Sequence, residues 1–152
     1  MSILIIGYGN CLRRDDGLGF RLAEALAEPS LPGVEVVACH QLVPELAERL
    51  THVSAVLFMD AIQEQRARVR VRRLILQPVQ AGWAHEFGPL AVLALARDVY
   101  AATPPAWLMT LPGADFSLGE GFSKLGVESF NRGLDRAKRW LRQQQKLWTQ
   151  RP

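Results

Sequence analysis

Residues 3–19 read ILIIGYGNCLRRDDGLG, and this stretch decides the class of fold. It opens with four aliphatic residues in a row, positions 3–6, and continues into a loop that holds four glycines. An unbroken aliphatic run of this kind is typical of a strand that is buried on both faces of a parallel sheet. The chain is therefore predicted to begin with a buried strand that ends at Gly7.

An amphipathic segment follows the glycine loop and predicts a helix that runs to about Glu28. Leucines recur there at four-residue spacing, with Ala25 on the neighbouring face. Asp15 or Asp16 can cap this helix, because a carboxylate accepts hydrogen bonds from the free amides of a first turn. The leucines are Leu18, Leu22 and Leu26.

Strand and helix patterns alternate along the rest of the chain. The predicted strands cover residues 34–38, 54–59 and 106–111. Pro112 and Gly113 are expected to break the last of them. The predicted helices begin after Pro44, over residues 86–100, and in a long terminal segment. The apolar stripe of the terminal helix consists of Val127, Phe130, Leu134, Ala137 and Leu141.

Buried strands that alternate with helices indicate a three-layer α/β/α sandwich around a mostly parallel sheet. Residues 66–76 differ, because arginine alternates with valine there. That pattern is typical of a half-exposed edge strand, which we expect to be antiparallel. With 152 residues, 49% of them hydrophobic, the chain forms one domain, 1–152, in the prediction, and its composition excludes intrinsic disorder.

The net charge of +3 is unevenly distributed. Residues 124–152 hold eight Lys and Arg against two Asp and Glu, a net charge of +6, so the rest of the chain carries −3. A basic terminal helix is typically a solvated face, and no RNA-binding pattern of aromatic and glycine residues accompanies it. We therefore expect no nucleic-acid partner.

The two cysteines, Cys11 and Cys39, form neither a CxxC pair nor a disulfide framework. The N-terminus lacks the basic region of a signal peptide, and no run reaches the roughly 18 apolar residues of a membrane span. We expect a cytoplasmic monomer that does not enter membranes.

Candidate functional residues gather where the carboxyl ends of the strands meet, since open α/β sheets bind ligands at that edge. The glycine loop does not match the dinucleotide fingerprint G-x-G-x-x-G, because Leu12 stands at its third glycine. No Gly-Lys-Ser/Thr follows, so nucleotide binding has little support. The loop offers two adjacent carboxylates instead, Asp15 and Asp16, and one of them is left over if the other caps the helix.

Two more groups are expected at this edge. Asp60 follows the buried run of residues 54–59 and is either a ligand or catalytic group or an aspartate that turn amides satisfy. His85 precedes a predicted helix and is either a cap or surface residue or a ligand. Two carboxylates and one imidazole suit a metal such as zinc or nickel and leave open positions for water or substrate.

The remaining polar residues give weaker predictions. His40 and Gln41 follow the second strand and either contact a substrate or hydrogen-bond a turn. Cys11 has no basic partner in the sequence and is interpreted as a small buried thiol rather than a nucleophile. No G-x-S-x-G elbow is present, so serine-type catalysis has no support.

The stretch IIGYGNCLRRDDGLG resembles the N-terminal signature of the nickel–iron hydrogenase maturation endopeptidases. Asp60 followed by Ala61, and a histidine that opens a helix, also match that family, and the resemblance covers nearly the whole chain. The segments HQL, at residues 40–42, and PELAE, at 44–48, are similar to members that serve bidirectional NAD-linked hydrogenases.

The resemblance implies a five-stranded sheet between helices and a metal site of three side chains: Asp16, Asp60 and His85. It implies a peptidase, often labelled aspartic-type, that removes a C-terminal extension from the hydrogenase large-subunit precursor after nickel insertion. The nickel is supplied by the precursor and acts as the recognition element. Asp16 and Asp60 are the catalytic candidates, and the general base stays unassigned.

One departure and two alternatives accompany the resemblance. Residues 112–120, PGADFSLGE, lack the Pro-Glu-Ser run of many relatives, so substrate pairing is expected to differ there. The first alternative is a non-catalytic flavodoxin-like module that binds a nucleotide or flavin. The second is an adaptor that docks a partner through its basic terminal helix.

Overall fold

The computed structural model describes residues 1–78 and 87–152, and five strands in this part of the chain form one sheet in the order β2-β1-β3-β5-β4. The strands are β1 (Ile3–Tyr8), β2 (Val34–Cys39), β3 (Ala55–Gln63), β4 (Arg70–Leu74) and β5 (Ala106–Gly113). All neighbours are parallel except β4, which pairs antiparallel with β5 at the edge. The predicted mostly parallel sheet with one antiparallel edge strand is confirmed.

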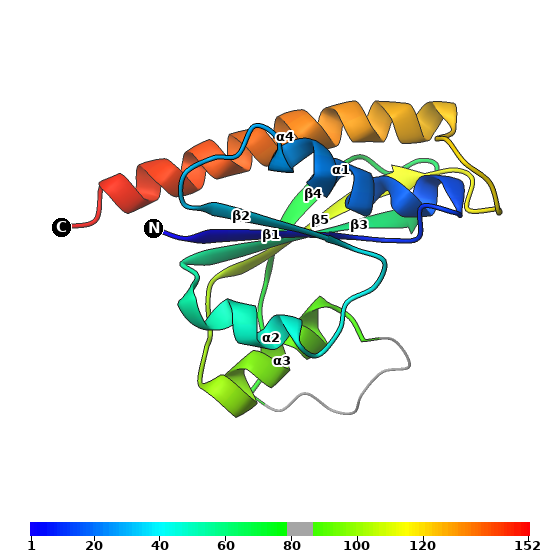
Figure 1. The fold of residues 1–152 in the computed structure, drawn as a ribbon. Helices are drawn as coiled ribbons and strands as arrows, with labels where there is room; N and C mark the ends of the chain where they lie inside the picture. Colours follow the sequence, from blue (N-terminus) through cyan, green and yellow to red (C-terminus); the bar gives the residue numbers. More distant parts are fainter. Residues whose placement is uncertain (79–86) are drawn as a thin grey trace.

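Helices cover both faces of the sheet (Figure 1). On one face lie α1 (Leu18–Ala27) and α4 (Lys124–Thr149), and on the other lie α2 (Leu46–Arg49) and α3 (Pro89–Tyr100). Two short 3-10 turns, η1 (Arg14–Gly17) and η2 (Leu50–His52), precede α1 and follow α2. The predicted three-layer α/β/α architecture is therefore confirmed.

The aliphatic run of β1 contributes to two separate cores. Ile3 and Ile5 pack in the core under α1 and α4, whereas Leu4 and Ile6 pack in the core over α2 and α3. All four side chains are fully buried. A central strand with helices on both faces requires apolar residues at every position, which explains the unbroken run.

The ends of three strands differ from the prediction. β3 continues to Gln63, so Asp60 lies within this strand and not at its end. β5 continues through Pro112, which the sequence pattern had placed in a break. The register explains this, because β4 pairs only with β5 residues 106–110 and leaves Pro112 with no ladder bond to lose on that side. β4 itself is shorter than the predicted 66–76.

Two details of the helices also differ from the prediction. Gly17 is the N-cap residue of α1, and no side chain donates or accepts a capping bond there, so neither Asp15 nor Asp16 caps this helix. Ala25 and Val127 are exposed rather than part of an apolar face. The buried stripe of α4 instead follows the small residues that let it approach the sheet, and it consists of Gly126, Ser129, Gly133, Ala137, Trp140 and Leu141.

Within residues 1–78 and 87–152, no helix has the length and apolar character needed to cross a membrane.

Candidate functional site

Two strand ends and the start of α1 meet at the carboxyl edge of the sheet. A Cβ atom on Gly19 would lie 2.3 Å from the carbonyl oxygen of Met59 and 2.6 Å from that of Tyr8. Only glycine fits there, because carbon atoms essentially never approach a carbonyl oxygen this closely. The glycine loop is therefore held against the ends of β1 and the middle of β3.

Asp16 occupies the η1 turn in this loop and is half-buried. Its carboxylate accepts a hydrogen bond from the backbone N–H of Asn10 at 3.1 Å. Gly9 makes this fold of the loop possible, since its φ of +148° is unfavourable for other residues and a Cβ there would lie 1.9 Å from the Asp16 carbonyl oxygen. The loop thus orients the Asp16 side chain through its own backbone.

Asp60 lies one residue beyond the β1–β3 ladder, whose last pair is Gly7 with Met59. Its other neighbour is Thr110 of β5, and the side chain is half-buried. Because the loop of Asp16 contacts β3 at Met59, the structure brings Asp16 and Asp60 to the same edge of the sheet. This juxtaposition was predicted from the sequence by a different route, as a strand end.

His85, the third predicted ligand, lies outside the described residues, as do residues 79–84 and 86. Its participation stays a prediction. Among residues 1–78 and 87–152, no three His, Cys, Asp or Glu side chains are grouped so that they could hold a metal ion. The described part of the chain therefore supplies two acidic groups and leaves the imidazole as an expectation.

His40 and Gln41 are exposed and follow the carboxyl end of β2. The ring of His40 stacks on that of Phe20, with centroids 5.2 Å apart and planes 16° from parallel. Phe20 belongs to α1 and lies one helical turn after Asp16. The stacking places His40 beside α1 at the same edge, and its role toward a substrate stays a prediction.

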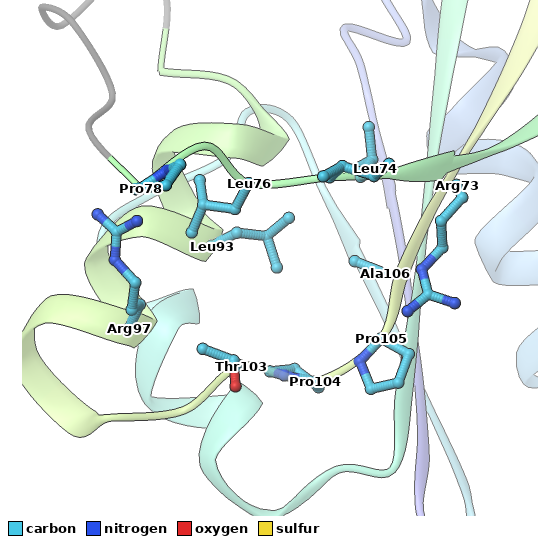
Figure 2. Close-up of a pocket in the computed structure, with 11 residues that line it drawn as sticks. Arg73, Leu74, Leu76, Pro78, Leu93, Arg97, Thr103, Pro104, Pro105 and Ala106 are labelled. Atoms are coloured by element: carbon cyan, nitrogen blue, oxygen red, sulfur yellow. The ribbon is translucent and has the colours of Figure 1, made fainter.

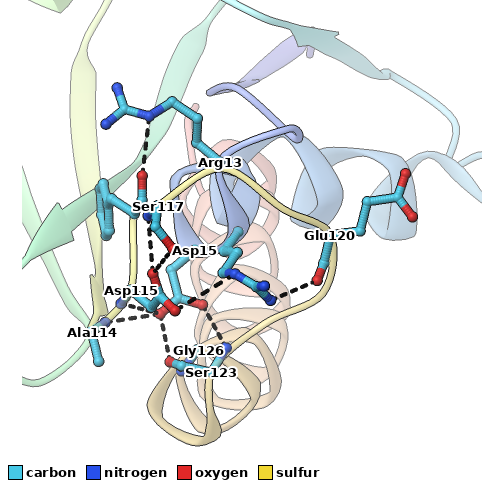
Figure 3. A network of polar contacts seen from close by, with 10 residues as sticks. Arg13, Asp15, Ala114, Asp115, Ser117, Glu120, Ser123 and Gly126 are labelled. Carbon is cyan, nitrogen blue, oxygen red and sulfur yellow. Dashed lines mark hydrogen bonds and ion pairs between the residues drawn. The ribbon is translucent and has the colours of Figure 1, made fainter.

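Asp15 has a structural task that the sequence analysis missed. Its carboxylate is fully buried and accepts hydrogen bonds from the amides of Ala114 (2.8 Å), Asp115 (3.2 Å) and Ser123 (2.8 Å) and from the Ser123 hydroxyl (2.5 Å) (Figure 3). Burial alone raises the pKa of Asp15, but the hydrogen bonds from these three residues outweigh burial and lower it. Asp15 thus ties η1 to the β5–α4 loop (residues 114–123).

Two arginines tie the same loops together. The guanidinium of Arg13 donates to the carbonyl of Phe116 at 3.0 Å, and that of Arg14 donates to the carbonyl of Glu120 at 2.9 Å. Arg14 adopts a φ of +44°, a left-handed backbone that non-glycine residues rarely adopt. We call Arg13, Arg14 and Asp15 the clamp, because all three side chains hold the β5–α4 loop.

Cys11 does not have the properties of a nucleophile. Burial raises the pKa of its thiol, although the nearby guanidinium of Arg21 acts in the opposite direction. The side chain is half-buried at a cleft of about 440 Å³ that Arg14 and Phe122 also line. The interpretation of Cys11 as a non-catalytic thiol agrees with this environment.

A larger hollow of about 530 Å³ lies elsewhere (Figure 2). Its lining includes Leu74, the last residue of β4, and Ala106, the first of β5, together with Arg97 of α3. Because β4 is antiparallel to the other strands, both positions lie at the amino edge of the parallel strands. This hollow is therefore at the opposite edge from Asp16 and Asp60.

No protein-family model and no curated protein sequence matches the chain, whereas several solved structures share its fold. The hydrogenase maturating endopeptidase HybD from Escherichia coli superposes with a TM-score of 0.77 at 23% identity, over 95% of this chain and 94% of that one. The NiFe hydrogenase maturation protease HycI from Thermococcus kodakarensis gives 0.71 at 23% identity, over 90% and 89%. The chain thus has the fold of these maturation proteases over nearly its whole length.

Proposed function

We propose that this protein is an endopeptidase that removes a C-terminal extension from the nickel-loaded large-subunit precursor of a nickel–iron hydrogenase. The observation that carries the proposal is the meeting of two carboxylates, Asp16 and Asp60, from separate segments at the carboxyl edge of the sheet. The fold shared with solved maturation proteases supports it. So does the match of the glycine loop to the signature of that family.

In this proposal the nickel belongs to the precursor and is the recognition element. Asp16, Asp60 and His85 complete its coordination and so place the scissile peptide at the sheet edge. Carboxylate and imidazole are suitable ligands for such a metal. The amide of Asn10 holds the Asp16 carboxylate in place for this task.

Hydrolysis also needs a group that takes a proton from the attacking water. Asp16 and Asp60 are the proposed catalytic carboxylates. They come from a turn and from a strand, so they are not related by the local symmetry of two equivalent loops. The aspartic-type label therefore remains part of the proposal, with the division of roles between the two carboxylates open to kinetic test.

Substrate recognition is proposed to involve His40 and Gln41. The stacking of His40 on Phe20 fixes an exposed imidazole one helical turn from Asp16. An exposed, oriented side chain beside the carboxylates can contact a bound precursor.

The test is cleavage of purified precursor, with and without nickel, followed by the mobility shift of the large subunit on a gel. We expect cleavage only of the nickel-loaded form. Asp16→Asn, Asp60→Asn and His85→Ala are each expected to reduce kcat by about 100-fold or more, which corresponds to the loss of a catalytic or metal-positioning group. Asp98→Asn is the matched control, since Asp98 is exposed and pairs with Arg97 on α3.

Equal cleavage without nickel would contradict the recognition role of the metal. Full activity in all three site variants would remove these residues from the site. The flavodoxin-like alternative is disfavoured by the loop amides. Those of Gly9, Asn10 and Leu12 already donate to protein oxygens and so are not available to a phosphate.

A further inference from the structure

Two leucines are prominently exposed at the carboxyl edge. Leu12 is 62% exposed and Leu118 is 80% exposed, although they belong to segments more than 100 positions apart in the sequence. The amide of Gly119 donates to the carbonyl of Leu12 at 2.8 Å, and Arg13 and Gly119 form a parallel bridge. In a parallel pairing this register sets Leu12 next to Leu118.

The clamp fixes both leucines in position. Leu12 precedes Arg13, whose side chain bonds the carbonyl of Phe116, and Leu118 lies between that carbonyl and the one that Arg14 bonds at Glu120. Asp15 fixes the two ends of the same loop through Ala114 and Ser123. A surface that is ordered before binding loses less conformational freedom when a partner arrives.

The position of the pair indicates what it contacts. Leu12 lies four residues before Asp16 in one loop, and the loop is folded tightly on the sheet edge. A protein that covers the two leucines therefore also comes next to Asp16. A substrate must reach that carboxylate, whereas a second copy of the chain docked there would obstruct it.

We propose that Leu12 and Leu118 form a single apolar contact that determines specificity by docking an apolar part of the precursor surface beside the cleaved segment. The inference rests on the proposed function and adds a recognition surface to it. Two adjacent aliphatic side chains exclude water from a matching apolar surface, and such anchors carry much of the affinity of an interface. The departure of residues 112–120 from the family pattern falls on this same loop.

The experiment measures KM and kcat for cleavage of nickel-loaded precursor by Leu118→Ser and Leu12→Ser. We expect KM to rise by about 10-fold in each variant, as for loss of an interface anchor, with kcat within about twofold of wild type. The melting temperature is expected to stay unchanged, because both side chains are largely exposed. Leu118→Met, which keeps an apolar side chain of similar volume, is expected to restore the wild-type KM.

Ile75→Ser is the matched control. Ile75 is 73% exposed and follows β4 at the opposite edge of the sheet, so its loss is expected to leave KM unchanged. If wild type cleaves the precursor and Leu118→Ser keeps the wild-type KM, the inference is wrong while the proposed function stands. A fall in kcat at constant KM, or a wild-type dimer on gel filtration that Leu118→Ser dissociates, also overturns it. If wild type does not cleave nickel-loaded precursor at all, the proposed function fails first and the inference fails with it.

Discussion

At the scale of single residues, two adjacent aspartates have different tasks. The carboxylate of Asp15 is fully buried and accepts four hydrogen bonds from the β5–α4 loop, whereas that of Asp16 is half-buried and accepts one from Asn10. The same substitution at the two positions should therefore have different consequences. Asp15 is a determinant of stability, and Asp16 is the proposed catalytic and metal-binding carboxylate.

Asp15→Asn is expected to lower the free energy of unfolding at pH 7 by roughly 2 to 3 kcal/mol, the cost of leaving charge-assisted hydrogen bonds unmade at a buried site. An amide cannot accept from all four donors, since one end of it is itself a donor. Urea denaturation followed by circular dichroism measures the change. Asp16→Asn is the control and should keep the wild-type midpoint, because the amide oxygen can still accept from Asn10.

The contribution of Asp15 to stability should depend on pH. The folded state lowers the pKa of this carboxyl, so the unfolded chain binds the proton more tightly than the folded one. The stabilisation is therefore fully present above the unfolded pKa of about 3.9 and is lost as the pH falls through the lower folded value. The difference in unfolding free energy between wild type and Asp15→Asn should be constant near neutral pH and shrink below about pH 4. A difference that grows on acidification would contradict the assignment.

At the scale of elements, the sheet edge depends on how closely α1 approaches it. Gly19→Ala improves helix propensity by about 1 kcal/mol, but its Cβ would lie 2.3 Å and 2.6 Å from carbonyl oxygens of β3 and β1. These are backbone atoms of central strands and cannot move aside cheaply, so overpacking should cost up to about 3 kcal/mol. We expect a net loss of roughly 2 kcal/mol in urea denaturation, together with reduced cleavage, because α1 would shift away from Met59 beside Asp60.

The control for this prediction is Ala25→Ser on the exposed face of the same helix. It should change the free energy of unfolding by less than about 0.5 kcal/mol. If Gly19→Ala is as stable as this control, the close approach of α1 to the strand ends is not a constraint on the fold.

Most of the architecture could be predicted from the sequence, because it follows from local pattern and general rules of topology. The aliphatic run at residues 3–6 indicated a strand buried on both faces, and the Arg/Val alternation before Leu74 indicated an edge strand. The errors arose where partners distant in the sequence decide the outcome. β5 passes through Pro112 because β4 ends before it, and Val127 is exposed because small residues of α4 face the sheet instead.

The candidate site divides along the same line. That Asp16 and Asp60 meet at one edge follows from the parallel topology, so the sequence sufficed to predict it. The burial of Asp15 did not follow, since nothing in the pair Asp15 and Asp16 distinguishes them until the β5–α4 loop is in place. Ser123, which donates to Asp15 and also caps α4, provided no sequence signal of its dual task. His85 lies outside the described residues and its role stays a prediction.

At the scale of the whole molecule, the proposed site and the end of the basic helix lie far apart. α4 begins next to the clamp and has 26 residues, so it is about 39 Å long at 1.5 Å per residue. Its last turns lie at the amino edge of the sheet, near the N-terminus (Figure 1). Leu147 and Trp148 border a small hollow there with Met1 and Trp107. The net charge of +6 in residues 124–152 is thus concentrated on a helix that leads away from Asp16 and Asp60.

Deletion of residues 146–152 distinguishes the protease from an adaptor that docks through its basic helix. The deletion removes two basic residues and the exposed end of α4, but it leaves the buried anchors Trp140 and Leu141 in place. We expect kcat/KM for nickel-loaded precursor to stay within about threefold of wild type, because rim charges contribute little to affinity. Asp60→Asn in the full-length chain should lose cleavage under the same conditions. The opposite pair of results, lost function on deletion with an unchanged near-ultraviolet circular dichroism spectrum and full function in Asp60→Asn, would favour the adaptor, since only the tail would then be required.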